Sequence, residues 1–361
     1  MSLRGKKIFL ISPQHWDSNK ISKHHYAETL INNGNIVYFI NPIAYGFFPK
    51  INIHKQADTL NIVTITIPLP KIAKFKFRFA FDHMVNKGFK KLLFLEGVPD
   101  ILWNFDNETY FSYESLFKKS IKIFHPVDMI VKKVNKKYNH LYDFVFSVSH
   151  EILDTIEHNQ KYFINHGLSV QFETFCKDSA VKNEDYLCKN ITYMGNISIP
   201  FLNRSAFIKM IQYFSHIKFK LIGVIDLNCE FQTQLKMFNN VEFLGRKSGT
   251  ELFESLLQSD FMLICYSKHE LYRADNSHKV LEYLSTGNPI ISSMLSTYKD
   301  YGDLISFVDF DSSEFLTQVE QILNNYHILN QSENREKRRQ LALNNTYQNQ
   351  LKKIEKLIQN K

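Results

Sequence analysis

Residues 277–291 constrain the fold more than any other stretch of this sequence, because they combine a helix, an abrupt stop and a buried strand. Apolar residues recur at helical spacing from Val280 to Leu284, so one face of the segment is apolar. Gly287 and Pro289 follow these residues, and together they form the signal that ends a helix. The two isoleucines directly after the stop predict a short buried strand. A helix that turns straight into such a strand is typical of an α/β protein.

The beginning of this helix has the residue types that a nucleotide diphosphate needs. Asn276 and Ser277 are typical helix-capping residues. The free backbone N–H groups at that end, with the positive end of the helix dipole, suit a phosphate. Glu282 lies about one turn deeper, where its carboxylate could accept hydrogen bonds from both hydroxyls of a ribose. These features predict half of a nucleotide-diphosphate site, and the alternative is an ordinary amphipathic helix before a strand.

The same stretch resembles a known motif. Its pattern Ser-x-Lys-x-x-Glu-Tyr-Leu-x-x-Gly-x-Pro, which begins at Ser277, is similar to the nucleotide-sugar motif of GT-B glycosyltransferases. It is most similar to the large retaining GT4-like family (glycosyltransferase family 1, or group 1) of bacterial polysaccharide and glycolipid synthesis. The resemblance implies an α/β chain of two facing Rossmann-like domains with parallel sheets, and a C-terminal helix that crosses back to the first domain. It also implies a hexosyltransferase-type enzyme (EC 2.4) with its active site in the cleft.

The length and composition fit a soluble protein with two domains. A chain of 361 residues is long enough for two separate cores, and 44% hydrophobic with 22% charged residues is typical of a globular protein. The four cysteines show no Cys-x-x-Cys spacing, so we expect neither a zinc site nor disulfides, and we expect a reducing cytoplasm. We also expect no signal peptide and no membrane span, since no apolar run is long enough.

The positive charge lies in the first half of the chain. Residues 1–168 contain 22 Lys and Arg against 14 Asp and Glu, whereas residues 169–361 contain 22 of each kind. The net charge of +8 therefore belongs to the first half. This asymmetry indicates an anionic partner for that half, either a membrane surface or a nucleic acid. Because no RNA- or DNA-binding motif accompanies the charge, we expect no nucleic acid.

The first half begins with a β-α-β unit over residues 8–40. Its two apolar strands should be parallel, with a right-handed crossover, and the lack of Gly-x-Gly-x-x-Gly argues against NAD binding. Ligands bind beyond the carboxyl ends of such strands, so His15 and Trp16 are candidate acceptor-binding residues. The alternative for Trp16 is a packed loop anchor. Lys20 and Lys23 could reach a phosphate, but solvated helix charges are the more usual case.

Residues 68–95 interleave basic and aromatic side chains. This mixture suits a segment at a membrane interface, with Phe side chains at the acyl boundary and Lys side chains at anionic headgroups. The alternative is an amphipathic helix whose Phe residues pack on its own sheet. The basic members are Lys71, Lys74, Lys76, Arg78, Lys87, Lys90 and Lys91, and the aromatic members are Phe75, Phe77, Phe79, Phe81, Phe89 and Phe94. We therefore expect residues 71–94 to contact an anionic membrane surface, at the inner face of the plasma membrane.

His125 and Asp128 follow an apolar strand at residues 121–124. The end of this strand in GT-B proteins often carries a histidine or aspartate that lines the sugar pocket, so the resemblance makes both residues catalytic candidates. A histidine there could donate a hydrogen bond to a hydroxyl of the donor sugar. It could equally be a core histidine whose hydrogen bonds are satisfied.

The resemblance also predicts the limits of the domains. Residues 1–170 form a basic N-terminal Rossmann-like domain on the acceptor side, and the polar residues 171–189 form a linker. Residues 190–340 form the C-terminal Rossmann-like domain on the nucleotide-sugar side. Residues 341–361 form the helix that packs back on the first domain, although a free amphipathic tail is an alternative.

By the same resemblance, the second domain contributes most of the donor site. Gly245 permits close backbone approach after a strand. The guanidinium of Arg246 suits phosphate by its geometry, with a surface charge pair as the alternative. Glu282 would hold the ribose. The predicted donor-binding residues are Asn196, Gly245, Arg246, Lys247, Ser277, His278, Lys279 and Glu282.

Two positions depart from the family pattern. Asn196 and Phe201 occupy the places of an Arg-x-x-x-x-Lys pair that neutralises the diphosphate. Ala274 stands where the Glu-x₇-Glu motif has its first carboxylate, so the role of that group near the donor sugar has no residue assigned to it. Lys279 could supply positive charge at the phosphates instead.

Together these features predict a glycosyltransferase that moves a sugar from a nucleotide-diphosphate sugar to a saccharide or lipid-linked acceptor. We expect no cofactor and no metal, because backbone dipoles and basic side chains can neutralise the leaving diphosphate. Two alternatives stay open. A sugar-nucleotide epimerase on the same fold would need a pair of carboxylates for proton abstraction, and a non-catalytic binding protein would keep the fold without the reaction.

Overall fold

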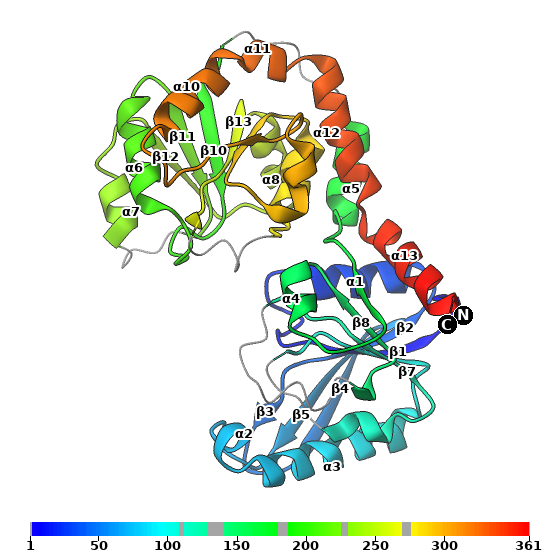
Figure 1. Cartoon of the computed structure of the whole chain (residues 1–361). Helices are drawn as coiled ribbons and strands as arrows, with labels where there is room; N and C mark the ends of the chain where they lie inside the picture. Colours follow the sequence, from blue (N-terminus) through cyan, green and yellow to red (C-terminus); the bar gives the residue numbers. More distant parts are fainter. Residues whose placement is uncertain are drawn as a thin grey trace. The chain divides into compact units, whose positions relative to one another are not determined.

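The chain divides into two compact units in a computed structural model (Figure 1). The structure describes residues 2–107, 112–128, 140–179, 187–224, 230–268 and 276–360. Unit 1 comprises Met1–Asn165 together with Tyr347–Lys361, and unit 2 comprises His166–Thr346. Each unit has its own sheet and its own apolar core.

The sheet of unit 1 has the strand order β3-β5-β2-β1-β6-β7-β8-β9, and β4 pairs with β5. Its strands are β1 (Lys7–Ile11), β2 (Ile36–Ile40), β3 (Ala44–Tyr45), β4 (Lys50–Ala57), β5 (Leu60–Ile67), β6 (Ile101–Asn104), β7 (Ile121–Phe124), β8 (Phe144–Ser147) and β9 (Lys161–Phe163). The parallel pairing of β1 with β2 confirms the predicted β-α-β unit. The antiparallel pair β4 and β5 was not predicted from the sequence.

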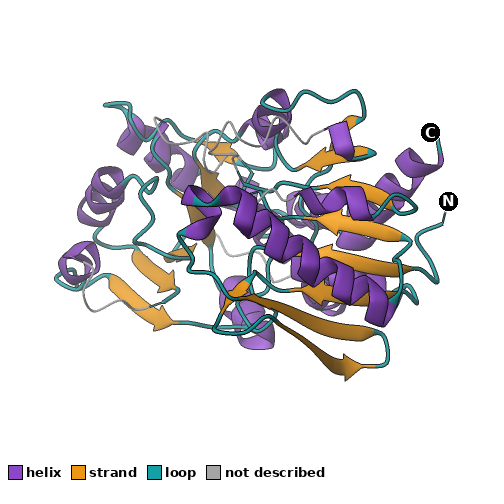
Figure 2. Cartoon of the chain, turned by 90° about the horizontal axis from the view of Figure 1, so that it is seen from below, coloured by secondary structure: helices purple, strands orange, loops and turns teal. Residues whose placement is uncertain are grey.

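Helices cover both faces of this sheet, because neighbouring strand residues point to opposite sides. Ile8 and Leu10 pack with residues of α1 and of the terminal helix α13, whereas Phe9 and Ile11 pack with residues of α3. Figure 2 shows α3 lying across the strands. The helices of unit 1 are α1 (Ser22–Asn32), α2 (Ala73–Lys76), α3 (Arg78–Glu96), η1 (Ser112–Leu116), α4 (His150–Asp154) and α13 (Tyr347–Gln359).

The sheet of unit 2 is parallel, with the strand order β12-β11-β10-β13-β14-β15. Its strands are β10 (Asn190–Met194), β11 (Lys218–Ile222), β12 (Val241–Gly245), β13 (Phe261–Ile264), β14 (Ile290–Ser292) and β15 (Ser306–Phe307). Its helices are α5 (Val170–Asp178), α6 (Arg204–Tyr213), α7 (Glu230–Leu235), α8 (Gly249–Leu257), α9 (Lys279–Thr286), η4 (Ser296–Tyr301), α10 (Phe315–Asn324), α11 (Tyr326–Leu329) and α12 (Ser332–Asn344).

The expected linker at 171–189 is partly a helix of unit 2. Phe172 and Cys176 lie four residues apart on α5, and both side chains are buried. This spacing buries one face of a segment whose overall composition is polar, so composition alone misled the prediction. The second unit therefore begins before the predicted boundary at residue 190.

The expected long helix at the end of the chain is two helices. α12 belongs to unit 2 and α13 to unit 1, with a break at residues 345–346. Ile354 and Ile358 of α13 are buried with the strand residues of unit 1, and the Leu3 N–H donates to Glu355 Oε1 at 2.9 Å. The C-terminal helix thus packs back on the first domain, as the resemblance implied, and it is not a free tail.

Candidate functional site

Glycines bring three strand ends of unit 2 close together. The Gly195 N–H donates to the Ile222 carbonyl at 2.7 Å, and the Gly223 N–H donates to the Gly245 carbonyl at 2.9 Å. A Cβ at Gly223 would lie 2.2 Å from the Gly195 carbonyl oxygen. Since no side chain fits there, glycine is required, and the carboxyl ends of β10, β11 and β12 form a closely packed floor. Gly195 and Gly223 line a pocket at this edge with Gln232 and Phe243.

The organising helix α9 begins beside this floor. Its apolar face, from Val280 to Leu284, is fully buried, and Gly287 ends it in the left-handed conformation with a φ of 78°. The Met194 N–H donates to the Tyr283 hydroxyl at 2.8 Å, which ties α9 to β10. The cap residue is His278, and no side chain caps the first turn. The predicted helix, its stop and the strand after it are confirmed.

The ammonium group of Lys279 lies against Gly195. A Cβ at Gly195 would be 2.4 Å from Lys279 Nζ, so the amine occupies the space that any other residue would fill. Lys279 Nζ lies 4.8 Å from the centroid of the Tyr193 ring and donates to the Tyr266 hydroxyl at 3.2 Å. Burial by itself lowers the pKa of Lys279, but its tyrosine neighbours outweigh that effect and raise the pKa above its usual value. A permanent positive charge therefore lies at the start of α9.

Glu282 presents a carboxylate without a protein partner. The side chain is half-buried, and among the described residues no group donates a hydrogen bond to its carboxylate. Burial raises the pKa of Glu282 to about 7, and the charge of Lys279 opposes this rise. An unpaired carboxylate at a partly buried position is costly unless a ligand supplies the donors. Glu282 is thus prepared to accept hydrogen bonds from hydroxyl groups.

The remaining donor-site residues lie around this helix start. Ser277 is half-buried, and its carbonyl accepts from the Val280 N–H at 3.1 Å. His278 is exposed, and its ring lies edge-on to that of His166 with centroids 6.2 Å apart. Asn196 is also exposed, and its side chain accepts from the Ser198 N–H at 2.8 Å in the turn after β10. Asn196 directly follows Gly195, and Ser277 and His278 directly precede Lys279, so all three are next in sequence to the two residues of that contact.

The two basic residues after Gly245 differ in their surroundings. Lys247 forms an ion pair with Glu251 at 2.6 Å, one turn along α8. Arg246 is exposed to solvent. Lys247 is therefore part of a surface charge pair, and Arg246 is the more exposed of the two cations.

Sequence reasoning missed His166. Its Nε2 atom lies 3.1 Å from the Asn276 carbonyl oxygen, and only 7% of the residue is exposed. The contact supports the chain just before α9. The turn Asn-His-Gly at 165–167 was noticed in the sequence only as a domain end, and nothing in it indicated this partner.

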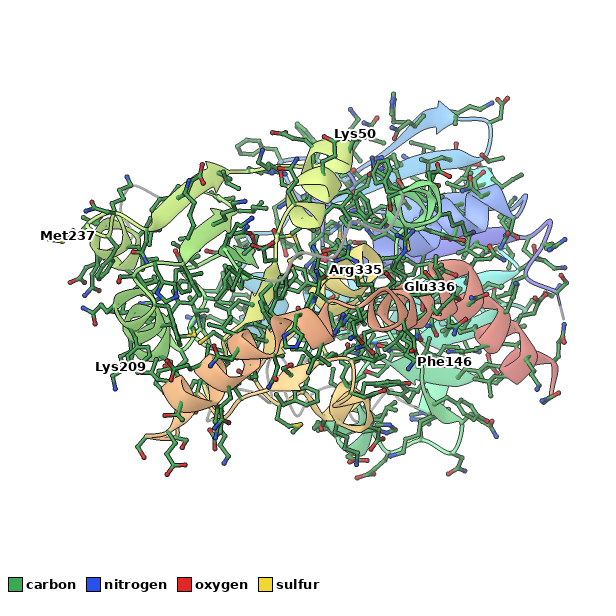
Figure 3. The ribbon with its side chains drawn as sticks, turned by 90° about the horizontal axis from the view of Figure 1, so that it is seen from above. Lys50, Phe146, Lys209, Met237, Arg335 and Glu336 are labelled. Atoms are coloured by element: carbon green, nitrogen blue, oxygen red, sulfur yellow. The ribbon has the colours of Figure 1, made fainter. Side chains whose placement is uncertain are left out.

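Two buried arginines of α12 hold the far end of α9, a third holds the end of α5, and sequence reasoning missed all three. Arg335 Nη1 donates to Asn288 Oδ1 at 2.8 Å, and Arg338 Nη1 donates to the Gly287 carbonyl at 3.1 Å. Arg339 donates to the Ser179 carbonyl at 2.9 Å. Figure 3 places Arg335 among the packed side chains of unit 2, whereas Met237 lies at its margin. α9 is thus fixed at both ends.

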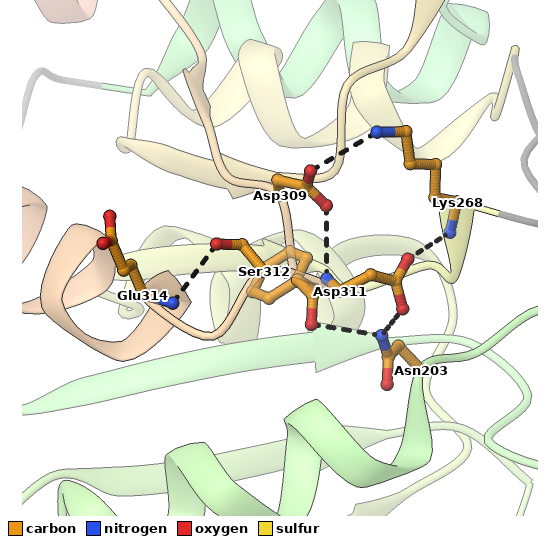
Figure 4. A network of polar contacts seen from close by, with 7 residues as sticks. Asn203, Lys268, Asp309, Asp311, Ser312 and Glu314 are labelled. Atoms are coloured by element: carbon orange, nitrogen blue, oxygen red, sulfur yellow. Dashed lines mark hydrogen bonds and ion pairs between the residues drawn. The ribbon is translucent and has the colours of Figure 1, made fainter.

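An Asp-x-Asp pair that sequence reasoning also missed fixes the loop after β13. Asp311 accepts from Asn203 Nδ2 at 2.9 Å and from the Lys268 N–H at 2.7 Å, and Asp309 Oδ2 lies 3.5 Å from Lys268 Nζ (Figure 4). These contacts make the pair a clamp for Lys268, the last residue described before the gap. Ala274, which stands where the family motif has its first carboxylate, lies in that gap, outside the described residues.

The catalytic candidates of unit 1 have different surroundings. His125 is 0% exposed, stacks on Phe105 with centroids 4.8 Å apart, and accepts from Trp103 Nε1 at 3.4 Å. These contacts favour the alternative of a core histidine, and its catalytic role stays a prediction. Asp128 is exposed, and its carbonyl accepts from Asn107 Nδ2 at 2.8 Å.

The two candidates in the loop after β1 also differ. Trp16 is 9% exposed, packs edge-on to Phe39 with centroids 4.9 Å apart, and donates its backbone N–H to Asn41 Oδ1 at 2.9 Å. These contacts favour the alternative of a packed loop anchor, and the role of Trp16 in acceptor binding stays a prediction. His15 is exposed, and its carbonyl lies 3.0 Å from His24 Nε2.

Lys23 contradicts the expectation of a solvated helix charge. Its side chain is fully buried, at 0% exposure, while Lys20, in the loop before α1, is exposed and paired with Glu28.

Among the described residues, no three His, Cys, Asp or Glu side chains gather in a way that could hold a metal. In the same part of the chain, no helix is both long and apolar enough to cross a bilayer.

Comparison with solved structures matches nearly the whole chain. A trehalose 6-phosphate synthase from Burkholderia multivorans superposes with a TM-score of 0.70 at 10% identity and 98% coverage of both chains. A sucrose-phosphate synthase from Thermosynechococcus elongatus gives 0.67 at 12% identity and 98% coverage of both chains. A trehalose-6-phosphate structure from E. coli, bound with UDP-2-fluoro glucose, gives 0.69 at 9% identity, over 98% of this chain and 99% of that one.

No family model and no curated protein matches the sequence. The structural similarity, by contrast, extends over 98% of this chain and so includes both units. These neighbours are GT-B proteins with two Rossmann-like domains. The chain has the GT-B fold.

Proposed function

We propose that this chain is a glycosyltransferase that moves a sugar from a nucleotide-diphosphate sugar to a saccharide or lipid-linked acceptor. The observation that carries the proposal is the half-buried carboxylate of Glu282, one turn inside α9, to which no group among the described residues donates a hydrogen bond. A ribose supplies two hydroxyl donors for that carboxylate, and a diphosphate supplies acceptors for the backbone N–H groups at the helix start. A nucleoside diphosphate offers both groups, and a nucleotide sugar carries the sugar to be transferred as well.

Each residue of the site has a role in the proposed reaction. Glu282 holds the ribose, while Lys279 and the first N–H groups of α9 hold the diphosphate and stabilise the charge that develops as it leaves. Arg246 adds a second cation from the end of β12. We propose that these groups replace a metal ion, so the reaction is metal-independent. Lys247 contributes less, because Glu251 already neutralises it.

The solved neighbours support this class of reaction. One is bound with UDP-2-fluoro glucose, another is a sucrose-phosphate synthase, and a third is a UDP-forming trehalose-phosphate synthase. Glycosyl transfer with retention is described for a trehalose-6-phosphate synthase that superposes with a TM-score of 0.63 at 10% identity. We propose retention for this chain as well, in the synthesis of a polysaccharide or glycolipid.

The proposal is tested by a thermal-shift screen against UDP, GDP, ADP, CMP and their sugars. One nucleotide should raise the Tm of the wild type, since a ligand well above its Kd stabilises the folded state by a few kcal/mol. Glu282→Ala should lose the shift, whereas Glu254→Ala, which changes an exposed glutamate on α8, should keep it. A wild type that no nucleotide stabilises would overturn the proposal.

A second assay separates the transferase from its two alternatives. Release of nucleoside diphosphate on adding an acceptor mixture is expected of a transferase. An epimerase would interconvert two nucleotide sugars without an acceptor, and a binding protein would release nothing. The stereochemistry of the product, read by NMR of the anomeric proton, tests retention.

We also propose that unit 1 binds an anionic membrane surface at the inner face of the plasma membrane. Phe75, Phe77 and Phe79 are 55%, 63% and 88% exposed, so they do not pack on the sheet as Phe81 and Phe89 do. Phe47 and Phe48 are also exposed, at 95% and 82%, and they follow β3, whose Tyr45 pairs with Ile67 at the end of β5. Each neighbouring basic residue contributes about 1 kcal/mol at an anionic surface.

Vesicle sedimentation tests the membrane proposal. The protein should bind vesicles with anionic lipid and not vesicles of neutral lipid alone. Combining Phe75→Ser, Phe77→Ser and Phe79→Ser should release it, while Met237→Ser, at an exposed residue of unit 2, should not. Equal binding of the triple variant and the wild type would refute the role of these phenylalanines.

A further inference from the structure

The carboxyl edge of the unit 1 sheet brings together one lysine and two aspartates from separate segments. β1, β6 and β7 are neighbours in parallel register, so their carboxyl ends lie at one edge. Lys23 is the second residue of α1, which follows β1, and Asp106 comes two residues after β6. Asp128 follows β7, and Asn107 Nδ2 donates to its carbonyl at 2.8 Å, which joins the two loops.

Lys23 is buried without a hydrogen-bond partner. It is 0% exposed, and among the described residues no acceptor lies within hydrogen-bond distance of its Nζ atom. Burial lowers the pKa of Lys23 to about 8, while the nearby charges of Asp128 and Asp106 oppose the change. Neither carboxylate lies close enough to form an ion pair with it. A buried amine in this condition destabilises the fold, which is typical of a group held for a ligand.

The charges at this edge distinguish between classes of ligand. Asp106 is 6% exposed, so its carboxylate is buried, whereas Asp128 is exposed and its carboxylate lies at the surface. A phosphate would meet two negative charges and one positive charge. A sugar hydroxyl both donates and accepts, so it can donate to a carboxylate and accept from the ammonium group at the same time.

We infer that Lys23, Asp106 and Asp128 form a binding site for an uncharged, hydroxyl-rich group at the carboxyl edge of the unit 1 sheet. Lys23 donates to one hydroxyl oxygen, and the two aspartates accept from neighbouring hydroxyls. The identification of this group as the sugar acceptor rests on the proposed function, whereas the binding site itself does not. The acceptor is then a neutral glycoside end, unlike the sugar phosphates for which the solved neighbours are named.

Saturation-transfer NMR on the full chain tests the inference. The probes are the methyl glycosides of glucose, galactose, mannose and N-acetylglucosamine, with glucose 6-phosphate as the anionic comparison. At least one neutral glycoside should receive saturation from the wild type. Lys23→Met and Asp128→Asn should each weaken its binding about tenfold or more, the effect of losing a charged hydrogen bond. Lys20→Met changes an exposed lysine nearby and should have no effect.

The Tm of the apoprotein distinguishes a binding lysine from a structural one. Lys23→Met should raise the Tm, because it removes a buried charge without a partner; a lower Tm would overturn the inference. Asp128→Asn, at an exposed side chain, keeps the test valid if Lys23→Met does not fold. A wild type that binds no neutral glycoside, or that binds only glucose 6-phosphate, also overturns it. The nucleotide shift described above should be unchanged in both variants, so failure of this inference is separate from failure of the proposed function.

Discussion

Lys279 Nζ lies where the side chain of residue 195 would begin, 2.4 Å from the position of a Cβ on Gly195. The amine and the glycine are 84 positions apart in the sequence, and each requires the other: the glycine leaves the space, and the amine fills it. This contact joins the turn after β10 to the first turn of α9, the two elements to which we assign the diphosphate.

Replacing Gly195 by alanine should therefore damage the site as well as the fold. The new Cβ would displace Lys279, and a φ of +133° adds backbone strain of about 1–3 kcal/mol. We expect a lower Tm and a nucleotide Kd raised at least about tenfold. Gly34→Ala is the matched control, because Gly34 has a φ of 81° with open space around it. It should lower the Tm without changing the Kd, and an equal change in Kd for both variants would rule out the displacement of Lys279.

Binding of a nucleotide sugar should strengthen as the pH rises through about 7. The ionised carboxylate of Glu282 accepts both ribose hydroxyls, and burial raises its pKa to about 7. Below that pH the protein must lose a proton to bind, so affinity should fall about tenfold between pH 8 and pH 6. Calorimetry with a nucleotide sugar, whose diphosphate does not titrate in this range, measures the effect. A profile in Glu282→Gln with the same slope would contradict the assignment.

The same carboxylate should make stability depend on pH. Its pKa is raised above the usual 4.5, so protonation favours the folded state. This contribution is fully present below about pH 4.5 and is lost as the pH rises through about 7. Glu282→Gln should therefore have a higher Tm than the wild type at pH 8, by about 2–4 °C, and the difference should shrink at pH 5. A glutamine variant that is less stable at pH 8 would show that the carboxylate has a structural partner.

Removing a buried arginine of α12 should destabilise unit 2. Arg338 donates to the carbonyls of Leu304, Gly287 and Leu329 at 2.8, 3.1 and 2.8 Å. Arg338→Leu would leave these carbonyls without a donor, and we expect the free energy of unfolding to fall by about 3–5 kcal/mol. Chemical denaturation measures the loss. Lys337→Leu, at an exposed neighbour on the same helix, should change it by less than about 0.5 kcal/mol.

Chelation should leave the reaction intact. Lys279 and the start of α9 provide the positive charge at the diphosphate, so product formation should continue in excess EDTA. Activity lost in EDTA and recovered with Mg²⁺ would show that a metal neutralises the leaving group instead.

The alternation of strands and helices was predictable because it depends on local periodicity. The apolar face from Val280 to Leu284 and the stop at Gly287 have the expected places, and Glu282 lies on the expected turn. Neighbours far away in the sequence were not predictable. Lys23 was expected to be solvated, and it is buried. A lysine looks the same in the sequence whether it is buried or solvated, so only the fold distinguishes the two environments.

The arginines of α12 illustrate the same limit. A helix whose sequence is Ser-Glu-Asn-Arg-Glu-Lys-Arg-Arg predicts a polar surface, yet Arg335 and Arg338 are 1% exposed. Arg338 donates to backbone carbonyls, which every residue carries, and Arg335 donates to the side-chain oxygens of Asn288 and Asn330. No sequence motif predicts such partners. The buried face of α5 was missed for a related reason, because charged residues surround Phe172 and Cys176.

The return of α13 to unit 1 has a consequence for the order of folding during synthesis. Leu351, Ile354 and Ile358 cover a sheet face whose strands were made at the beginning of the chain. Unit 2 is continuous in sequence and can close its core before α13 leaves the ribosome. Unit 1 cannot, and its face beneath α13 stays open to water and to chaperones until α13 has been synthesised. Of the two units, the one whose strands are synthesised earlier is thus the one that is completed later.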